Sequence, residues 1–505
     1  DANTTADGNT AMGINALSST TTGNSNTAVG QNAGLLNTTG TMNAVLGNHA
    51  FDANTTGSYN TALGGQALSA NTTANYNVGV GLNALLVNTT GTLNVAVGAL
   101  ALDANTTADN NVAVGHGSLS ANTTGAQNTT VGTYSLDANT TASNNTGLGY
   151  AALTANTTGT QNVGVGTNAL GANTTAANNT AVGHYALLAN TTGASNVAVG
   201  AHALDANTTA ANNTAIGTGS LGANTTGTRN SGVGASAMGL NTTGDYNTAM
   251  GYDALGANTT ADNNTAFGYT ALAANTTGAN NTALGYQALT TCTTGPANVA
   301  IGKSSSNALT TGANCTTLGH NSGPGITSGS NNMCLGNNSG KTGSPGGALT
   351  TSSDSIRVGD GSVTNAHIQV DWTIASDQRD KTDFTALDLG LDFVKDLKPV
   401  TYKWDKRSKY GDKTADDYDL NAQSPDGTHK EDWLDIGFKA QEVEALEIAA
   451  GYNKSSKTNL VSSHSGDGKQ MGLQYSKFVP ILVNAIQEQQ TLIESLTARI
   501  TTLEG

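Results

Sequence analysis

Few side chains in the first 340 residues have the types and spacing that chemistry requires. This stretch carries 10 Asp and no Glu, so it offers no obvious pair of carboxylates for glycoside hydrolysis. It also carries five His. His116 and His184 occupy equivalent positions of a repeat, four copies apart, which is roughly 19 Å at the spacing of stacked strands and too far to share a metal ion. We therefore expect neither a metal site nor a bound cofactor.

Three further residue sets in this stretch invite a chemical interpretation. The Asn-Thr-Thr triplets match the N-glycosylation acceptor sequence, the cysteines Cys292, Cys315 and Cys334 suggest redox chemistry, and exposed tyrosines stack well on sugars. The Asn of the triplets form an uninterrupted column, Cys292 and Cys315 replace ladder Asn residues, and Cys334 replaces a small core residue. The tyrosines lie at the variable corners of the repeat. We therefore favour internal Asn columns, buried cysteine spacers and ordinary corner residues, and leave the chemical alternatives open. The tyrosines are Tyr59, Tyr76, Tyr150, Tyr185, Tyr252, Tyr269 and Tyr286.

A strict period organises this first part of the chain. Gly recurs from Gly13 in steps of 17 to Gly336 without a slip, in twenty copies of roughly N-T-A-V-G-x-x-A-L-x-A-N-T-T-G/A-x-x. An apolar residue precedes each of these glycines, and an Asn stands four positions before all but one of them, where Cys315 interrupts. A second Asn column runs from Asn37 to Asn275.

These columns predict a parallel β-solenoid of twenty 17-residue coils. One coil cannot bury its own apolar face, so identical columns imply that each coil stacks on the last. Helical repeats need about 34 residues and a spacing of i, i+3, i+4, which is absent. We expect the apolar and Ala columns to fill a thin core and the Asn columns to form amide ladders. From about residue 303 the pattern decays into cap coils.

Composition excludes several classes of protein. Only 11% of the 505 residues are charged, and the net charge of −15 disfavours nucleic acid or an anionic membrane as partner. The 63 Gly lack the three-residue period and the Pro content of collagen. No apolar stretch reaches the length of a membrane span, so we expect no membrane insertion. Residues 1–340 resemble the head repeats of trimeric autotransporter adhesins, a resemblance that implies a left-handed β-roll and side-by-side trimers.

The C-terminal part has a different composition, with 25 of the 35 acids and 18 of the 20 bases after residue 340. Ile356–Val358 and His367–Ile374 are predicted strands, and residues 341–375 form a linker and short neck. Four features then follow in order: S-D-x-R-x-K from Ser376, K-P-V-x-Y-x-W from Lys398, G-F-x-A-Q-E-V-E from Gly437, and a terminal helix with apolar heptads. Ile486, Ile493 and Ile500 carry the heptad pattern, with Leu496 and Leu503, and predict a coiled coil over about 479–504.

Residues 376–505 resemble the C-terminal intramolecular chaperone of phage endosialidases, tail spikes and tail fibres. The resemblance implies a small α+β domain that trimerises, guides folding of the preceding fibre and cuts itself off once. It assigns Ser376 as nucleophile, Lys381 as base and the bond between Ala375 and Ser376 as the cleavage site. A Ser hydroxyl needs a neighbour that takes its proton, and Lys can do so only when its pKa is depressed. Asp380, beside Lys381, departs from the family pattern and opposes that depression.

The sequence therefore predicts a mainly β, homotrimeric fibre or receptor-binding appendage of a phage tail, extracellular on the virion. Its partners would be itself and a host cell-surface receptor, with glycan as one candidate. A cellular trimeric surface adhesin is the alternative, and an enzyme that degrades host glycans is disfavoured by the regular repeats. The chain begins within a repeat and without Met. An upstream region with either a particle-attachment domain or a secretion signal would separate the first two interpretations.

Overall fold

The structure is a computed structural model that describes residues 2–363, 366–367, 369, 376–411, 418–452, 461–465 and 468–505. The chain divides into two compact units, residues 1–298 and 299–505. The predicted strand His367–Ile374 lies outside the described residues apart from His367 and Gln369.

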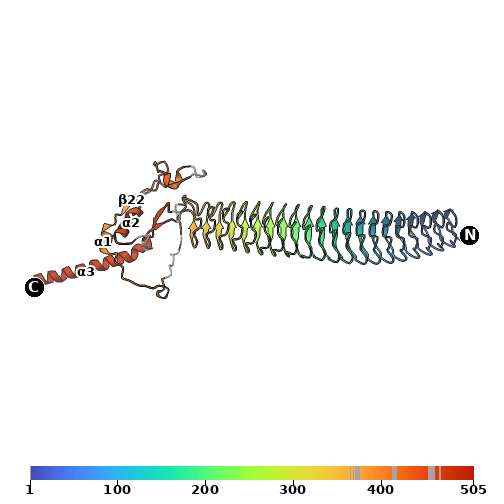
Figure 1. Cartoon of the computed structure of the whole chain (residues 1–505), viewed down its shortest axis with the longest axis horizontal. Coiled ribbons are helices and arrows are strands. Elements are labelled where there is room, and N and C mark those ends of the chain that lie inside the picture. The colour runs from blue at the N-terminus through green and yellow to red at the C-terminus, as the bar shows by residue number, and fades with distance from the viewer. Residues whose placement is uncertain are drawn as a thin grey trace. The chain divides into compact units, whose positions relative to one another are not determined.

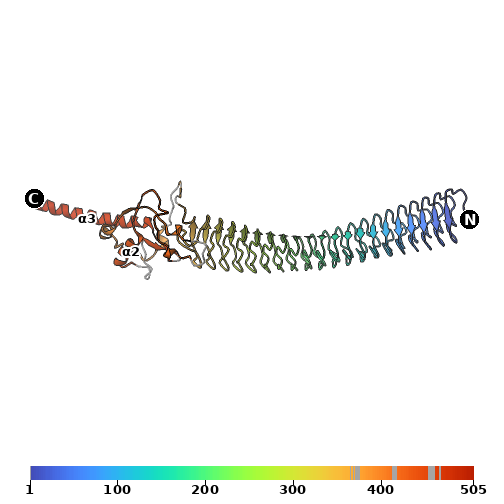
Figure 2. The same ribbon diagram turned by 90° about the horizontal axis from the view of Figure 1, so that it is seen from above.

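The first unit is a parallel β-solenoid with one three-residue strand per coil. Each strand pairs in parallel with the equivalent strand of the next coil, as Val163 pairs with Thr180. Figures 1 and 2 show these coils following one another in a single row. The strands are β1 (Thr10–Met12), β2 (Thr27–Val29), β3 (Ala44–Leu46), β4 (Thr61–Leu63), β5 (Val78–Val80), β6 (Val95–Val97), β7 (Val112–Val114), β8 (Thr129–Val131), β9 (Thr146–Leu148), β10 (Val163–Val165), β11 (Thr180–Val182), β12 (Val197–Val199), β13 (Thr214–Ile216), β14 (Ser231–Val233), β15 (Thr248–Met250), β16 (Thr265–Phe267) and β17 (Thr282–Leu284).

Glycine at the repeat position is required by the backbone. Gly166 has φ +127°, a conformation that L side chains rarely adopt, and a Cβ there would lie 2.5 Å from the carbonyl oxygen of Gly183. The same close approach recurs from coil to coil, as at Gly149 and Gly183. This column therefore lets the coils stack at the spacing that the β ladder demands.

The core is thinner than expected, because the apolar column before each Gly lies outside it. In β11 the middle residue Ala181 is fully buried, whereas Val182 is 36% exposed, and the same column leaves Ile216 41% and Leu284 47% exposed. Successive side chains of a strand point to opposite faces, so when the middle residue points inward the first and third residues point outward. The small middle residues and the Leu four positions after the Gly, such as Leu187, fill the interior, as expected for the Ala column and for this second apolar column. The expectation that the apolar column before each Gly fills the core is wrong.

Both Asn columns are buried amide ladders, as predicted. In the first column the Asn43 backbone N–H donates to Asn26 Oδ1 at 3.0 Å, and Asn43 Nδ2 donates to the carbonyl oxygen of Gly57 at 3.0 Å. In the second column Asn54 Nδ2 donates to Asn37 Oδ1 at 2.7 Å. The Asn of the Asn-Thr-Thr triplets from Asn37 to Asn275 is therefore enclosed in the folded coil, and the structural interpretation of these triplets is confirmed.

The three cysteines are buried thiols, which confirms them as spacers. Cys292 Sγ contacts the Gly295 carbonyl oxygen at 3.4 Å, and Cys315 Sγ contacts that of Gly329 at 3.2 Å. These carbonyls occupy the positions where the amides of the two ladders find theirs. A thiol can thus replace an Asn in either ladder with a weaker donor.

The second unit begins with four more parallel rungs and continues into a small α+β domain. Ile356–Val358 forms the predicted strand and pairs with β20, with Ile356 opposite Met333, so this last coil is longer than the others. Pro480 lies in the first turn of α3, where its missing N–H costs nothing. The elements are β18 (Val299–Ile301), β19 (Thr316–Leu318), β20 (Met333–Leu335), β21 (Ile356–Val358), α1 (Leu391–Asp396), β22 (Val400–Tyr402), β23 (Asp435–Gly437), α2 (Ala440–Ala449), β24 (Ser462–His464), β25 (Met471–Leu473) and α3 (Phe478–Glu504), with the 3-10 turns η1 (Gln378–Asp380), η2 (Arg407–Lys409), η3 (Leu420–Ala422) and η5 (Tyr475–Lys477).

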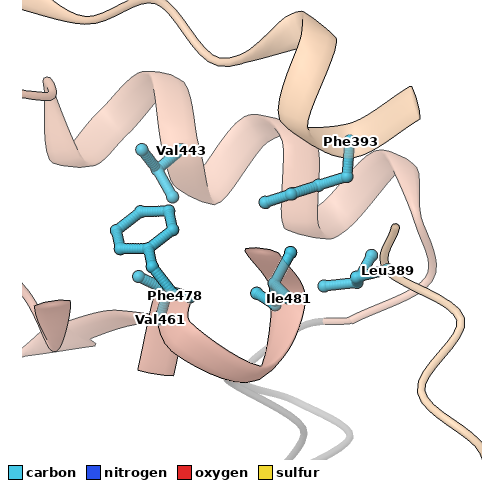
Figure 3. Packing of buried hydrophobic residues seen from close by; sticks show 6 residues of the cluster. All are labelled: Leu389, Phe393, Val443, Val461, Phe478 and Ile481. Atoms are coloured by element: carbon cyan, nitrogen blue, oxygen red, sulfur yellow. The ribbon is translucent and has the colours of Figure 1, made fainter. Parts of the chain in front are cut away.

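One apolar cluster joins the three helices of this domain. Figure 3 shows Phe393 of α1, Val443 of α2 and two residues of α3 turned toward one another, with Leu389 and Val461 beside them. The two residues of α3 are Phe478 and Ile481, on its first turn. The rest of α3 contributes no buried side chain after Ala485. Among the described residues, no helix combines the length and the apolar character needed to cross a bilayer.

Candidate functional site

Ser376 and Lys381 lie at the two ends of a single tight turn. The turn is η1, with Asp377 as its N-cap and Lys381 as its C-cap. The Lys381 backbone N–H donates to the Gln378 carbonyl oxygen at 3.2 Å, which reverses the chain direction. As a result Lys381 Nζ lies 2.6 Å from Ser376 Oγ. The structure therefore brings together the nucleophile and base that the sequence suggested.

A second pair of side chains braces the same turn. Asp377 Oδ1 accepts a hydrogen bond from the Arg379 backbone N–H at 2.9 Å, and the two Asp377 oxygens lie 2.6–3.2 Å from the Arg379 guanidinium. The guanidinium and then the backbone N–H of Arg379 hold the pKa of the Asp377 carboxyl below its usual value. The carboxylate raises the pKa of Arg379 in return. Sequence reasoning noted both residues as part of a motif but gave neither a role.

Asp380 does not engage the lysine. Within the described part of the chain, no carboxylate lies within ion-pair distance of Lys381 Nζ, whose contact is the serine hydroxyl. Ala375, the residue on the other side of the expected cut, lies outside the described residues. Ser376, Asp377, Arg379 and Lys381 are all exposed in the single chain.

Side chains of α3 form hydrogen bonds with the backbone of the segment that follows the turn. Asn484 Nδ2 donates to the carbonyl oxygens of Leu387 and Leu389 at 3.2 Å each, and Glu488 Oε2 accepts from the Leu391 backbone N–H at 2.6 Å. The sequence gave no sign of these contacts, because they join residues almost a hundred positions apart. They connect the path of the chain after Lys381 to the terminal helix.

The segments of the C-terminal motif set also meet in space. β22, from the K-P-V-x-Y-x-W segment, pairs antiparallel with β23, which leads into α2 of the G-F-x-A-Q-E-V-E segment, with Val400 opposite Gly437. Glu447 of α2 is buried, and its carboxylate accepts hydrogen bonds from the backbone N–H groups of Val461 and Ser462. The second and third segments of the motif set thus belong to one packed domain with the start of α3.

The tyrosines of the solenoid corners stack on one another. The ring centroids of Tyr252 and Tyr269 are 5.4 Å apart, and those of Tyr269 and Tyr286 are 5.3 Å apart, with nearly parallel planes. Tyr59 and Tyr76 stack in the same way at 4.9 Å. The ring faces that meet within a stack cover one another, while the rings as a whole stay about half exposed.

Comparison with known families matches residues 376–452 to the family described as chaperone of endosialidase. The match begins at Ser376, the first residue of the braced turn. No curated protein matches the chain. The C-terminal part therefore carries an endosialidase-type intramolecular chaperone domain behind a β-solenoid, an arrangement that fits a tail-fibre-like protein.

Proposed function

We propose that the chain is a homotrimeric tail-fibre or receptor-binding appendage whose C-terminal chaperone directs trimer folding and then cleaves itself off before Ser376. The observation that carries the proposal is the match to the endosialidase chaperone, which starts at a serine in contact with a lysine. The solenoid in front of it would be the shaft and display surface of a virion appendage. A host cell-surface receptor, with glycan as one candidate, would bind along the shaft.

The proposed cleavage uses one serine, one lysine and one water. Lys381 as a neutral amine takes the Ser376 hydroxyl proton while Oγ forms a bond to the Ala375 carbonyl carbon. The carbon–nitrogen bond then breaks, the proton passes to the released Ser376 amine, and an ester joins Ala375 to Ser376 Oγ. Water hydrolyses this ester and frees the Ala375 carboxylate and the Ser376 hydroxyl. Each chain reacts once, because the step consumes its own peptide bond.

Assembly would control this reaction through burial. A lysine amine acts as a base near neutral pH only when low polarity or nearby cations disfavour its protonated form. In the single chain the Ser376–Lys381 pair is open to water. Neighbouring copies of the chain would supply the missing cover, so that the cut follows correct assembly.

Two exposed apolar surfaces support self-association. The column before each Gly leaves half-exposed Val, Leu, Ile and Met side chains facing outward along the solenoid, among them Val182 and Leu284. A partner that covers such a stripe over many coils must repeat with the same rise of about 4.8 Å, and a second copy of this chain does so. On α3, Ile493, Leu496 and Ile500 are about half exposed and lie at heptad spacing. The number three comes from the family resemblance.

Intact-mass spectrometry of the freshly expressed full chain tests the proposal. We expect two pieces split before Ser376 from the parent and from the control Ser362→Ala, which alters an exposed serine outside the turn. Ser376→Ala should give a single uncut chain, and so should Lys381→Met. A single 505-residue species from the parent would contradict self-cleavage.

A further inference from the structure

We infer that Asp377 and Arg379 are positioning residues for the Ser376–Lys381 pair, an inference that rests on the proposed self-cleavage. Asp377 would hold the turn, and Arg379 would balance the charge beside the lysine. Neither residue would touch the bond that breaks. The backbone of the turn and its charges support these roles independently.

Lys381 reaches Ser376 only through the fold of the backbone between them. Five residues of extended chain span about 17 Å, far more than a lysine side chain covers, so the contact at 2.6 Å exists only while the turn is formed. One isolated 3-10 turn is marginal in water, because its few hydrogen bonds barely offset the ordering of the chain. Asp377 Oδ1 supplies an additional bond at the N-cap by accepting from the Arg379 backbone N–H at 2.9 Å.

The turn carries two cations, Arg379 and Lys381, with different chemistry. Arg379 cannot accept a proton, so only Lys381 can serve as the base. The Arg379 guanidinium binds the Asp377 carboxylate through two nitrogens, and its side-chain hydrogen bonds within the described part of the chain are with this carboxylate and not with the serine hydroxyl. The charged residues next to Lys381 in the chain are Asp377, Arg379, Asp380 and Asp383. Within the described residues, this turn makes no ion pair with another element.

The N-cap hydrogen bond and the charge balance predict different effects for different substitutions. Asp377→Asn keeps a side-chain oxygen for the cap but removes the negative charge. Asp377→Ala removes both, and Arg379→Gln keeps the cap while it removes the positive charge. An unbalanced cation beside a lysine disfavours its protonated form, and an unbalanced carboxylate favours it. The pH midpoint of cleavage should therefore move down in Asp377→Asn and up in Arg379→Gln.

The experiment follows cleavage of the full chain after cell-free synthesis, by intact mass over time between pH 6 and pH 9. Only assembled chains, separated by size-exclusion chromatography, enter the rate measurement. We expect Asp377→Ala to cut about tenfold more slowly than the parent and Asp377→Asn to stay within about threefold at its own optimum. Gln378→Ala, in the same turn but outside the brace, should match the parent.

The outcomes separate this inference from the self-cleavage that it rests on. If the parent stays uncut, the proposed function itself fails. If the parent is cut and Ser376→Ala is not, the inference is overturned by equal rates for Asp377→Ala and the parent. It is also overturned if Asp377→Asn and Arg379→Gln move the midpoint in the same direction or leave it unchanged. Opposite shifts with rescue by Asn support it, since a purely structural role predicts no such pair of shifts.

Discussion

Buried amides hold neighbouring coils together one residue at a time. Asn156 Nδ2 donates to Asn139 Oδ1 at 3.2 Å and to the Gly159 carbonyl oxygen at 3.0 Å, while Asn156 Oδ1 accepts from Asn173 Nδ2 at 2.8 Å. Each amide thus links three successive coils. Burying an amide without partners is costly, so the ladder specifies which coil positions can face one another.

Removing one amide should destabilise the solenoid locally. Asn156→Ala leaves Asn139 Oδ1 and one N–H of the Asn173 amide without a partner, at roughly 1–3 kcal/mol each, so we expect a loss of at least about 2 kcal/mol. The Gly159 carbonyl oxygen still accepts from Asn145 Nδ2 at 2.9 Å. Asn156→Cys should lose less, because Cys292 occupies the same column and still contacts a carbonyl. Guanidinium unfolding and hydrogen exchange of residues 145–175 measure the effect. The exposed neighbour Thr158→Ala is the control, and an equal loss there would contradict a specific role for the ladder.

Asp103 should destabilise the folded chain at neutral pH but not at low pH. Its Oδ1 is buried without a hydrogen-bond partner among the described residues, and burial raises the pKa of this carboxyl, partly offset by the backbone N–H groups of Asp103 and Ala104. A raised pKa in the folded chain means that the charged form weakens folding as the pH rises through that value. Below the ordinary value of 3.8 the carboxyl is protonated in both states and the penalty disappears.

Asp103→Asn should therefore raise the melting temperature at pH 7 and leave it unchanged at pH 3. Asp137 is the matched control, because it occupies the same repeat position and its Oδ1 accepts a hydrogen bond from Thr154 Oγ1 at 2.6 Å. Asp137→Asn should give no gain at pH 7. Thermal unfolding by circular dichroism at both pH values decides the question, and a gain that persists at pH 3 would exclude a charge effect.

At the level of elements, α3 serves two purposes along its length. Its first turn contributes Phe478 and Ile481 to the domain core, and its later turns carry the half-exposed heptad residues Ile493, Leu496 and Ile500. A helix with an unpaired apolar stripe is stable mainly when a partner covers that stripe. The terminal half of α3 therefore depends on association.

Placing a charge in this stripe should prevent assembly without unfolding the domain. Ile493→Asp would bury a carboxylate between helices, so we expect monomers and at least a hundredfold weaker association. Ala498→Asp adds the same charge on the opposite, exposed side of the helix and should leave association intact. Light scattering coupled to size-exclusion chromatography reads the oligomeric state. Monomers from both variants, or from neither, would contradict an interface along the heptad residues.

The sequence predicted those features of the solenoid that the residue type at a single repeat position determines. The coil period and both amide ladders were predictable, since a buried Asn recurs only where a neighbour can satisfy it. The outward orientation of the apolar column before each Gly was not predictable. An apolar residue in a three-residue strand is compatible either with the core or with an interface between chains. The small residue in the middle of each strand was the available signal for the inward position.

Other features depend on backbone geometry and distant contacts that one sequence does not display. Leu187 and its equivalents adopt positive φ, as Leu187 does at 51°, although Leu rarely does so. Full burial of the side chain and a hydrogen bond from the Leu187 N–H to the Ala203 carbonyl oxygen offset that strain. The Ser376–Lys381 pair was expected from the family resemblance, whereas the brace by Asp377 emerged only from the folded turn.

At the level of the whole molecule, repetition makes the correct register hard to find. A shift by one whole coil places Thr on Val, Ala on Gly and Val on Leu, the same types that already pair among β9, β10 and β11. A slipped chain therefore loses little in each coil and fails only at its ends. A domain that joins the chains at the C-terminus would set one register, from which coils add in order.

Refolding should consequently depend on the covalent link to the chaperone domain. We expect uncut Ser376→Ala to regain its oligomer after dilution from guanidinium. The separated product 1–375 should remain aggregated or misaligned under the same conditions, because nothing then fixes the register. Adding the released 376–505 fragment in trans should not restore the yield, since an untethered domain cannot align the chains. Light scattering and circular dichroism at equal protein concentration quantify recovery. Efficient recovery of native oligomers by 1–375 alone would remove the need for a chaperone and reduce residues 376–505 to a clamp.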